Sequence, residues 1–192
     1  IFIAGAGVQW LRDKLNFFKK ASETESIVRS LEDNKGVYLV PAFTGLGAPY
    51  WDANARGVLS GLTRDTGRKE IIRATIESVA YQTYDLFEAM KHDGLRPKLV
   101  KVDGGMVMNN WFSQFLSDVV DIRVLRPKVQ ETTALGAAFM AGLQIGVYKS
   151  LKDISKNWHL DKNFTPKIST KKRNYLVKGW SEAIKKTLTK AI

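Results

Sequence analysis

The clearest candidate for chemistry in this sequence is a glycine pair that follows an apolar run. Asp103–Gly105 come directly after residues 99–102, and Asn109 and Asn110 open a stretch in which apolar residues recur at helical spacing. Glycine permits a positive φ in a turn and leaves room for a ligand beside the backbone. The N–H groups at a helix start suit phosphate. The stretch therefore predicts either a tight turn before an asparagine-capped helix or one wall of a ligand site, with amide groups from the asparagines.

A second glycine-containing stretch, Gly5–Gly7, allows the same two interpretations: close packing at a helix start, or the close approach of a ligand. Neither stretch is a standard phosphate-binding fingerprint, because the sequence contains no G-x-x-x-x-G-K-[ST] and no G-x-G-x-x-G. The glycines alone therefore do not identify a ligand.

The composition excludes several other chemistries. The 192 residues contain no cysteine, which excludes disulfides and thiolate catalysis, and their two histidines, His92 and His159, are too few for a histidine-rich metal site. No run of about 18 apolar residues is present, so we expect no membrane insertion. The net charge is +11, and residues 149–192 hold twelve of the 30 basic but three of the 19 acidic residues. We interpret this basic tail as a solvated surface, with a nucleic-acid-binding module as the alternative.

Patterns typical of helices and strands alternate along the chain, which predicts an α/β domain with helices packed on a partly parallel sheet. The predicted helices are 1–20, 22–34, 69–91, 109–120, 132–146 and 173–190, and the predicted strands are 36–43, the start of 57–68, 97–105 and 122–127. The chain opens in the middle of a pattern, without Met or a signal peptide, so we expect it to be a piece of a longer protein.

One stretch is specific enough to suggest a family. "GVLSGLTRDTGRKEIIRATIE", Gly57–Glu77, resembles a signature of the FGGY family of sugar and polyol kinases. Five further segments resemble the family members that phosphorylate glycerol, in the same order and at the same spacing: "AGAGVQWLRD", "VPAFTGLGAPYWD", "RATIESVAYQT", "VDGGMVMNN" and "TALGAAFMAGL". The resemblance runs from the first residue to about Trp180.

The resemblance implies an actin-like ATPase (ribonuclease H-like) domain, with a mixed sheet and helices on both faces. Residues 1–192 would be the C-terminal, nucleotide-binding domain, with 1–148 as its core and 149–192 as a basic helical tail. The family uses ATP and Mg²⁺, and its pattern implies nucleotide contacts at Gly5, Gln9, Gly105 and Asn109. Its catalytic Asp and first domain would lie upstream of Ile1. We therefore expect no catalytic residue and no metal ligand here, and no activity from this chain alone.

Several expectations stay open at the level of sequence. The substrate could be another sugar or polyol of the same family, such as xylulose or gluconate. Asp103 is expected to have a role at the strand end or to lie near the metal and the phosphates, and not to be the catalytic base. Met106 and Met108 either line a base pocket or fill the core. The family resemblance also implies glycerol and ATP as small-molecule partners, a homo-oligomer, a cytoplasmic location, and binding of no nucleic acid.

Overall fold

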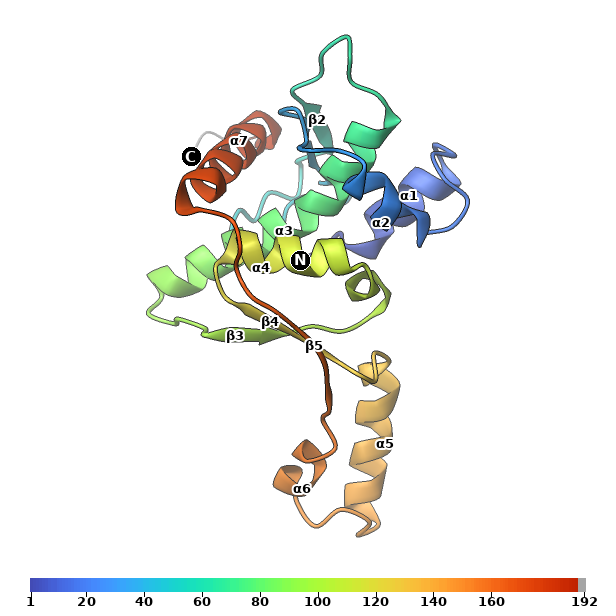
Figure 1. The fold of residues 1–192 in the computed structure, drawn as a ribbon. Helices are drawn as coiled ribbons and strands as arrows, with labels where there is room; N and C mark the ends of the chain where they lie inside the picture. Colours follow the sequence, from blue (N-terminus) through green and yellow to red (C-terminus); the bar gives the residue numbers. More distant parts are fainter. Residues whose placement is uncertain (190–192) are drawn as a thin grey trace.

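The computed structural model describes residues 1–189. A long central helix, α3 (Arg68–His92), lies between two small sheets (Figure 1). It is packed against α1 (Gly5–Asp13), α2 (Glu23–Arg29) and α4 (Asn110–Val120). Segments that are distant in sequence therefore meet on one helix.

The start of α3 is well specified by its sequence. Gly67 is the N-cap, and its backbone N–H donates to Glu70 Oε2 at 3.0 Å, which is the reciprocal contact of a capping box. Residues 72–81 of this helix are buried throughout, so α3 runs through the core and is not a surface helix. The predicted bounds, 69–91, match the observed helix closely.

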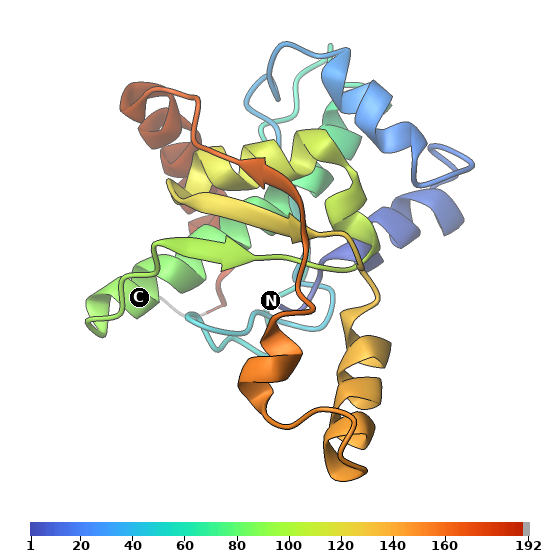
Figure 2. The same ribbon diagram turned by 60° about the horizontal axis from the view of Figure 1, so that its bottom comes forward.

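The strands form a two-stranded and a three-stranded sheet. β1 (Tyr38–Val40) is antiparallel to β2 (Val58–Ser60). β3 (Leu99–Lys101) is parallel to β4 (Arg123–Pro127), and β4 is antiparallel to β5 (Leu160–Phe164), so the second sheet is mixed as expected. Within residues 1–189, α4 covers one face of this sheet, and Figure 2 shows no described helix over the other.

The segment 149–192 is more than the helical tail that its sequence suggests. It contains α6 (Leu151–Ser155), the unpredicted strand β5, and α7 (Thr170–Thr187). Leu176, Trp180 and Ile184 of α7 are buried, whereas most of its lysines are exposed. The basic residues of α7 thus form a solvated face of a core helix. The last predicted residue of this helix, position 190, lies outside the described residues.

Two other helices differ from expectation. α1 ends at Asp13 and not near residue 20, because Asn16 takes a left-handed backbone (φ 55°) and the chain turns back to bury Phe18. α5 (Thr132–Gln144) has the predicted helical form but buries only Gly142, and together with α6 it projects from the end of the sheet (Figure 1). No helix in residues 1–189 has both the length and the apolar character that a membrane span requires.

α7 is fixed to α3 by a buried polar contact. The Trp180 indole N–H donates to Asp85 Oδ2 at 2.7 Å, and the Trp180 ring stacks on Tyr81 with centroids 5.3 Å apart. Burial raises the pKa of Asp85 to about 6, although the hydrogen bond from Trp180 opposes this shift. A carboxyl whose pKa is higher in the folded than in the unfolded state lowers stability as the pH rises between those two values.

We predict that Asp85→Asn flattens the pH dependence of stability. The wild-type free energy of unfolding should fall relative to the variant as the pH rises from about 4 to about 7, by a total of about 2–3 kcal/mol, because each pKa unit is worth about 1.4 kcal/mol. Asparagine keeps an acceptor for the Trp180 N–H. Urea unfolding at several pH values measures the effect, and Asp93→Asn, at an exposed carboxylate, is the matched control. Parallel profiles for wild type and Asp85→Asn would contradict the prediction.

Candidate functional site

A cavity of about 450 Å³ lies where α1, the start of α2, α3 and the start of α4 meet. All four predicted nucleotide-binding residues line it: Gly5, Gln9, Gly105 and Asn109. The first two come from α1, and the other two lie at the start of η1 and directly after its end, before α4. The structure therefore brings together residues that are about 100 positions apart in sequence, in a space of the size that small-molecule sites have.

The two glycines after β3 have different roles. Gly104 has φ +83°, a conformation that favours glycine, so it makes the turn. Gly105 begins the short 3₁₀ helix η1 (Gly105–Met108) with an ordinary backbone, and a Cβ placed on it would meet no atom within 4 Å. Gly5 is likewise open, whereas a Cβ on Gly7 would lie 3.1 Å from Thr75. Neither folding geometry nor packing requires glycine at Gly5 or Gly105, although both face the cavity.

Asn109 performs the capping role that the sequence left open. Its Oδ1 accepts the Phe112 N–H at 2.9 Å, which caps α4, and its Nδ2 lies 3.4 Å from Thr24 Oγ1. The amide oxygen is thus committed to the helix, and the amide nitrogen is the part that remains available to a ligand.

The start of α4 is not the free phosphate site that the sequence suggested. Glu25 of α2 accepts the Asn110 N–H through Oε2 at 3.1 Å, and its Oε1 accepts from Arg29 at 2.8 Å. The Asn109 side chain accepts the Phe112 N–H. Two of the first three backbone N–H groups of α4, those of Asn110 and Phe112, are therefore already hydrogen bonded. The phosphate interpretation of this helix start was therefore wrong, because a carboxylate from α2, 85 residues away, already occupies it. The start of α1, by contrast, has no side-chain cap and carries Gly5.

The charge on Glu25 is stabilised by these contacts. Partial burial works against ionisation, but the hydrogen bonds from Arg29 and from the Asn110 N–H hold the pKa of Glu25 below its ordinary value. Glu25 thus remains an anion at neutral pH and joins α2 to α4 at the edge of the cavity.

A buried polar network on α3 holds the segment that follows α2. Glu77 is fully buried, and its Oε1 accepts from Arg73 Nε at 2.7 Å. Its Oε2 accepts from Asn34 at 3.1 Å and from Tyr81 at 3.2 Å. Arg73 also donates to the Leu31 carbonyl oxygen at 2.6 Å, directly after α2. Burial raises the pKa of Glu77, opposed first by the charge on Arg73.

The rest of the cavity wall is partly apolar, with polar groups at its edge. Apolar contacts come from both α1 and α3, together with the η1 methionines, and Met108 is half exposed. The other lining residues are Val8, Arg12, Ala21, Ser22, Thr24, Glu25, Ile76, Met106 and Met108. Sequence reasoning missed Arg12, although it lies one helical turn beyond Gln9 on the same face of α1. The α2 residues that line the cavity could not be predicted in this way. They are distant from Gln9 and Gly105 in sequence, and that separation does not show which residues come into contact.

The site has no evident catalytic base in the described residues. Glu25 is its only carboxylate, and both of its oxygens are hydrogen bonded. Asp103 is exposed and does not line the cavity, and neither histidine does. The geometry is that of a binding cavity built on a mixed α/β fold.

The comparisons with known proteins identify the class. The family model described as "FGGY family of carbohydrate kinases, C-terminal domain" matches residues 1–145. The chain belongs to this family.

Curated relatives that match the whole chain include glycerol kinases. Glycerol kinase 1 of Pseudomonas aeruginosa is 53% identical over 191 residues, which cover 100% of this chain and 39% of that protein. Glycerol kinase of Coxiella burnetii is also 53% identical, over 100% of this chain and 38% of its own length. The chain thus spans less than two fifths of the curated relatives it matches.

The solved structures agree. Plasmodium falciparum glycerol kinase with ADP superposes with a TM-score of 0.85 at 36% identity, covering 97% of this chain and 37% of that chain. A ligand-bound xylulose kinase from Lactobacillus acidophilus superposes with a TM-score of 0.76 at 25% identity. The match covers 95% of this chain and 37% of that chain. The expected actin-like, mixed α/β fold class is therefore confirmed. The expected helices on both faces of the sheet are seen on one face within residues 1–189, where α4 covers it.

We predict that Asn109→Ala destabilises the chain by about 1 kcal/mol, the usual cost of removing an N-cap. Asn109→Ser, which restores a capping oxygen, should recover most of this loss. Chemical unfolding measures both values, and Asn110→Ala is the control because its side chain caps no helix N–H group in residues 1–189. Equal stability of Asn109→Ala and wild type would show that Oδ1 does not cap α4.

Proposed function

We propose that the cavity binds the adenine nucleotide of an ATP-dependent kinase. The observation that carries this proposal is the pair of open glycines, Gly5 and Gly105: both line the cavity, and a Cβ at either would meet no atom of the protein within 4 Å. A ligand that lies against the backbone explains why neither position carries a Cβ. The Plasmodium falciparum neighbour, a glycerol kinase with ADP, supports the choice of nucleotide.

Different groups of the cavity would contact the phosphates, the polar atoms and the base of the nucleotide. The uncapped start of α1 at Gly5 offers backbone N–H groups and the positive end of a helix dipole to phosphate. Gln9 and the amide nitrogen of Asn109 are the polar contacts, and Gly105 lets the nucleotide approach the backbone. The thioethers of Met106 and Met108 give a polarisable surface for the base.

Magnesium would be held chiefly by the nucleotide and water. Mg²⁺ takes octahedral oxygen ligands, typically phosphates and waters with one or two carboxylates. The only carboxylate that lines this cavity in residues 1–189, Glu25, is already hydrogen bonded through both oxygens, so the donor set does not fit a protein-bound metal. When bound with the nucleotide, the ion would neutralise phosphate charge.

We propose that the reaction served by this domain is transfer of the γ-phosphoryl group of ATP to glycerol, giving sn-glycerol 3-phosphate. The whole-chain identity to glycerol kinases supports this proposal. The acceptor for the alcohol proton would come from outside this chain, as would the groups that contact glycerol. The 192 residues alone are therefore expected to lack turnover. A homo-oligomer and a cytoplasmic location are proposed on the same relationship.

A second candidate is a kinase for xylulose or gluconate. Structures with those names share the fold at 25% identity, compared with 53% for the glycerol kinases in sequence. A panel of polyols and sugars, assayed with a full-length enzyme that carries this chain, should show a preference for glycerol of at least about tenfold in kcat/KM, the equivalent of 1.4 kcal/mol. A preference for a pentulose or an aldonate would overturn the glycerol assignment and leave the nucleotide cavity unaffected.

We predict that enlarging Gly105 reduces nucleotide affinity without unfolding the protein. Gly105→Ala and Gly105→Val should weaken ADP binding progressively, with Val costing at least about tenfold, because each added methyl group occupies the space that the nucleotide needs. The melting temperature should change little, since a Cβ there meets no atom within 4 Å.

The control is Gly136→Val, which is equally open but lies on α5, away from the cavity. Calorimetric titration with ADP measures affinity, and thermal unfolding reports on the fold. Unchanged ADP affinity in Gly105→Val, with the fold intact, would contradict the proposed pose.

A further inference from the structure

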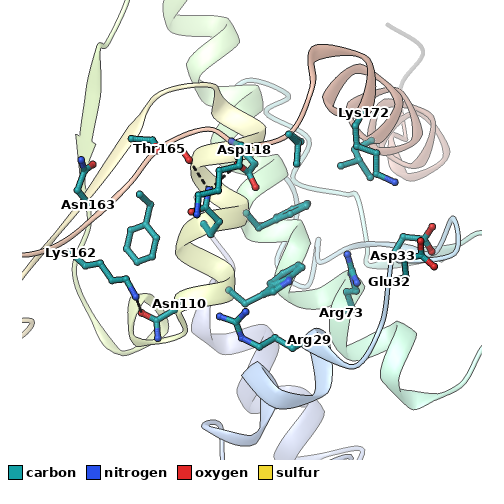
Figure 3. A pocket seen from close by; sticks show the side chains of 17 residues that line it. Arg29, Glu32, Asp33, Arg73, Asn110, Asp118, Lys162, Asn163, Thr165 and Lys172 are labelled. Carbon is teal, nitrogen blue, oxygen red and sulfur yellow. Dashed lines mark hydrogen bonds between the residues drawn. The ribbon is translucent and has the colours of Figure 1, made fainter.

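A second cavity, of about 490 Å³, borders the same helices α2, α3 and α4 as the proposed nucleotide cavity, and Figure 3 shows its lining. It is enclosed by α2, α3, α4, β5 and the start of α7. α2 separates the two spaces: Thr24 and Glu25 line the first, whereas Arg29, one turn further on, lines the second. The start of α4 divides in the same way, with Asn109 in the first and Asn110 in the second.

Cationic side chains gather at one end of this second cavity. Figure 3 shows Arg29 and Lys162 on either side of Asn110, whose Oδ1 accepts from Lys162 Nζ at 3.1 Å. Within residues 1–189, no carboxylate lies within ion-pair distance of Lys162 or of Lys172 on the far wall, so their charges are not neutralised by the fold. Arg29 pairs with Glu25 through Nε and Nη2, and its Nη1 has no acceptor in the described part of the chain.

A buried arginine reaches the same space. Arg73 is 7% exposed, yet it lines the cavity, and its guanidinium lies 4.9 Å from the centre of the Trp111 ring. Nε is used by Glu77 and Nη1 by the Leu31 carbonyl. Nη2 has no acceptor among residues 1–189. A donor on a side chain that is nine-tenths buried is thus left for a group that enters from the cavity.

The acidic residues of the lining lie apart from this end of the cavity. Figure 3 shows Asp118 beside Thr165, where its Oδ1 accepts from Gln114 at 2.9 Å and from the Lys167 N–H at 2.6 Å. Glu32 and Asp33 lie together on the side of the cavity away from Lys162 (Figure 3). The cavity is therefore polarised, with its cationic end at Arg29 and Lys162.

The wall between the two ends is aromatic. The Trp111 and Phe115 rings stack with centroids 5.0 Å apart, and Phe164 of β5 lines the cavity beside them. Guanidinium groups bind phosphate through paired N–H donors, and an aromatic wall favours an apolar or ring-shaped body. We propose that this cavity is a binding site for a small phosphate monoester, with its phosphate held by Arg29, Arg73 and Lys162 and its organic part against the edge of the aromatic wall of Trp111, Phe115 and Phe164.

The site differs from the proposed nucleotide cavity in its residues, and neither proposal depends on the other. Phenyl phosphate is a suitable probe because it combines the two features that the cavity recognises. Calorimetric titration of the 192-residue chain at constant ionic strength should show one saturable site. Lys162→Gln, at an exposed strand residue, should weaken binding at least about tenfold, and Arg29→Gln should do the same, since each removes a charged donor.

Two controls locate the probe. Lys171→Gln removes an exposed lysine that does not line the cavity, next to Lys172, which does, and it should leave the affinity within about twofold. Gly105→Val alters only the nucleotide cavity and should also leave phenyl phosphate binding unchanged. Circular dichroism and thermal unfolding verify the fold of each variant.

Three results would overturn the proposal. The first is the absence of saturable binding of phenyl phosphate at millimolar concentration by the folded chain. The second is an equal loss of affinity in Lys162→Gln and Lys171→Gln, which would indicate attraction to the general basic surface. The third is a loss in Gly105→Val but not in Lys162→Gln, which would place the probe in the nucleotide cavity.

Discussion

The arrangement of both cavities depends on one buried carboxylate, Glu77. Taking a carboxylate out of water is costly unless it is paired and hydrogen bonded, and Glu77 has a guanidinium, an amide and a phenol around it. Through Arg73 and Asn34 the network holds the segment after α2 against α3. α2 is a wall that the two cavities share, and this contact, together with the Glu25 hydrogen bond to the start of α4, fixes its position. Removing Glu77 alone would leave a buried arginine without its partner, which is the more destabilising way to break such a network.

The stretch that most clearly indicates the family is largely structural. Within Gly57–Glu77, Gly61 has φ +82° and a side chain there would collide with the Gly36 carbonyl oxygen, while Glu70 caps α3 and Glu77 anchors α2. Ile76 is the residue of this stretch that lines the proposed nucleotide cavity, and Arg73 lines the second cavity. The residues proposed to bind the nucleotide come from short glycine-containing segments elsewhere. Residues that fix the local fold therefore form a longer recognisable sequence motif here than the residues proposed to contact the ligand.

Much of the fold could be predicted from the sequence, since α3 and α4 follow from helical periodicity and the turn at Gly104 follows from its glycine. The failures have physical causes. β5 is polar and mostly exposed, so it lacks the alternation that indicates a strand. α1 was predicted too long because Leu15 and Phe18 continue its period beyond the left-handed Asn16. The four cavity residues were foreseen through family resemblance, but the occupation of the α4 start by Glu25 depends on tertiary contact, which periodicity does not encode.

The contacts of α7 have a consequence for the order in which the protein can assemble during synthesis. The Tyr38 hydroxyl donates to the Leu176 carbonyl across 138 positions, and Asp85 accepts from Trp180 across 95. β1 and the middle of α3 thus leave the ribosome long before the helix that covers them. Such distant pairing slows folding and leaves apolar surface exposed in the meantime. The nascent chain must therefore carry an incomplete core, open to chaperones, until α7 has been translated.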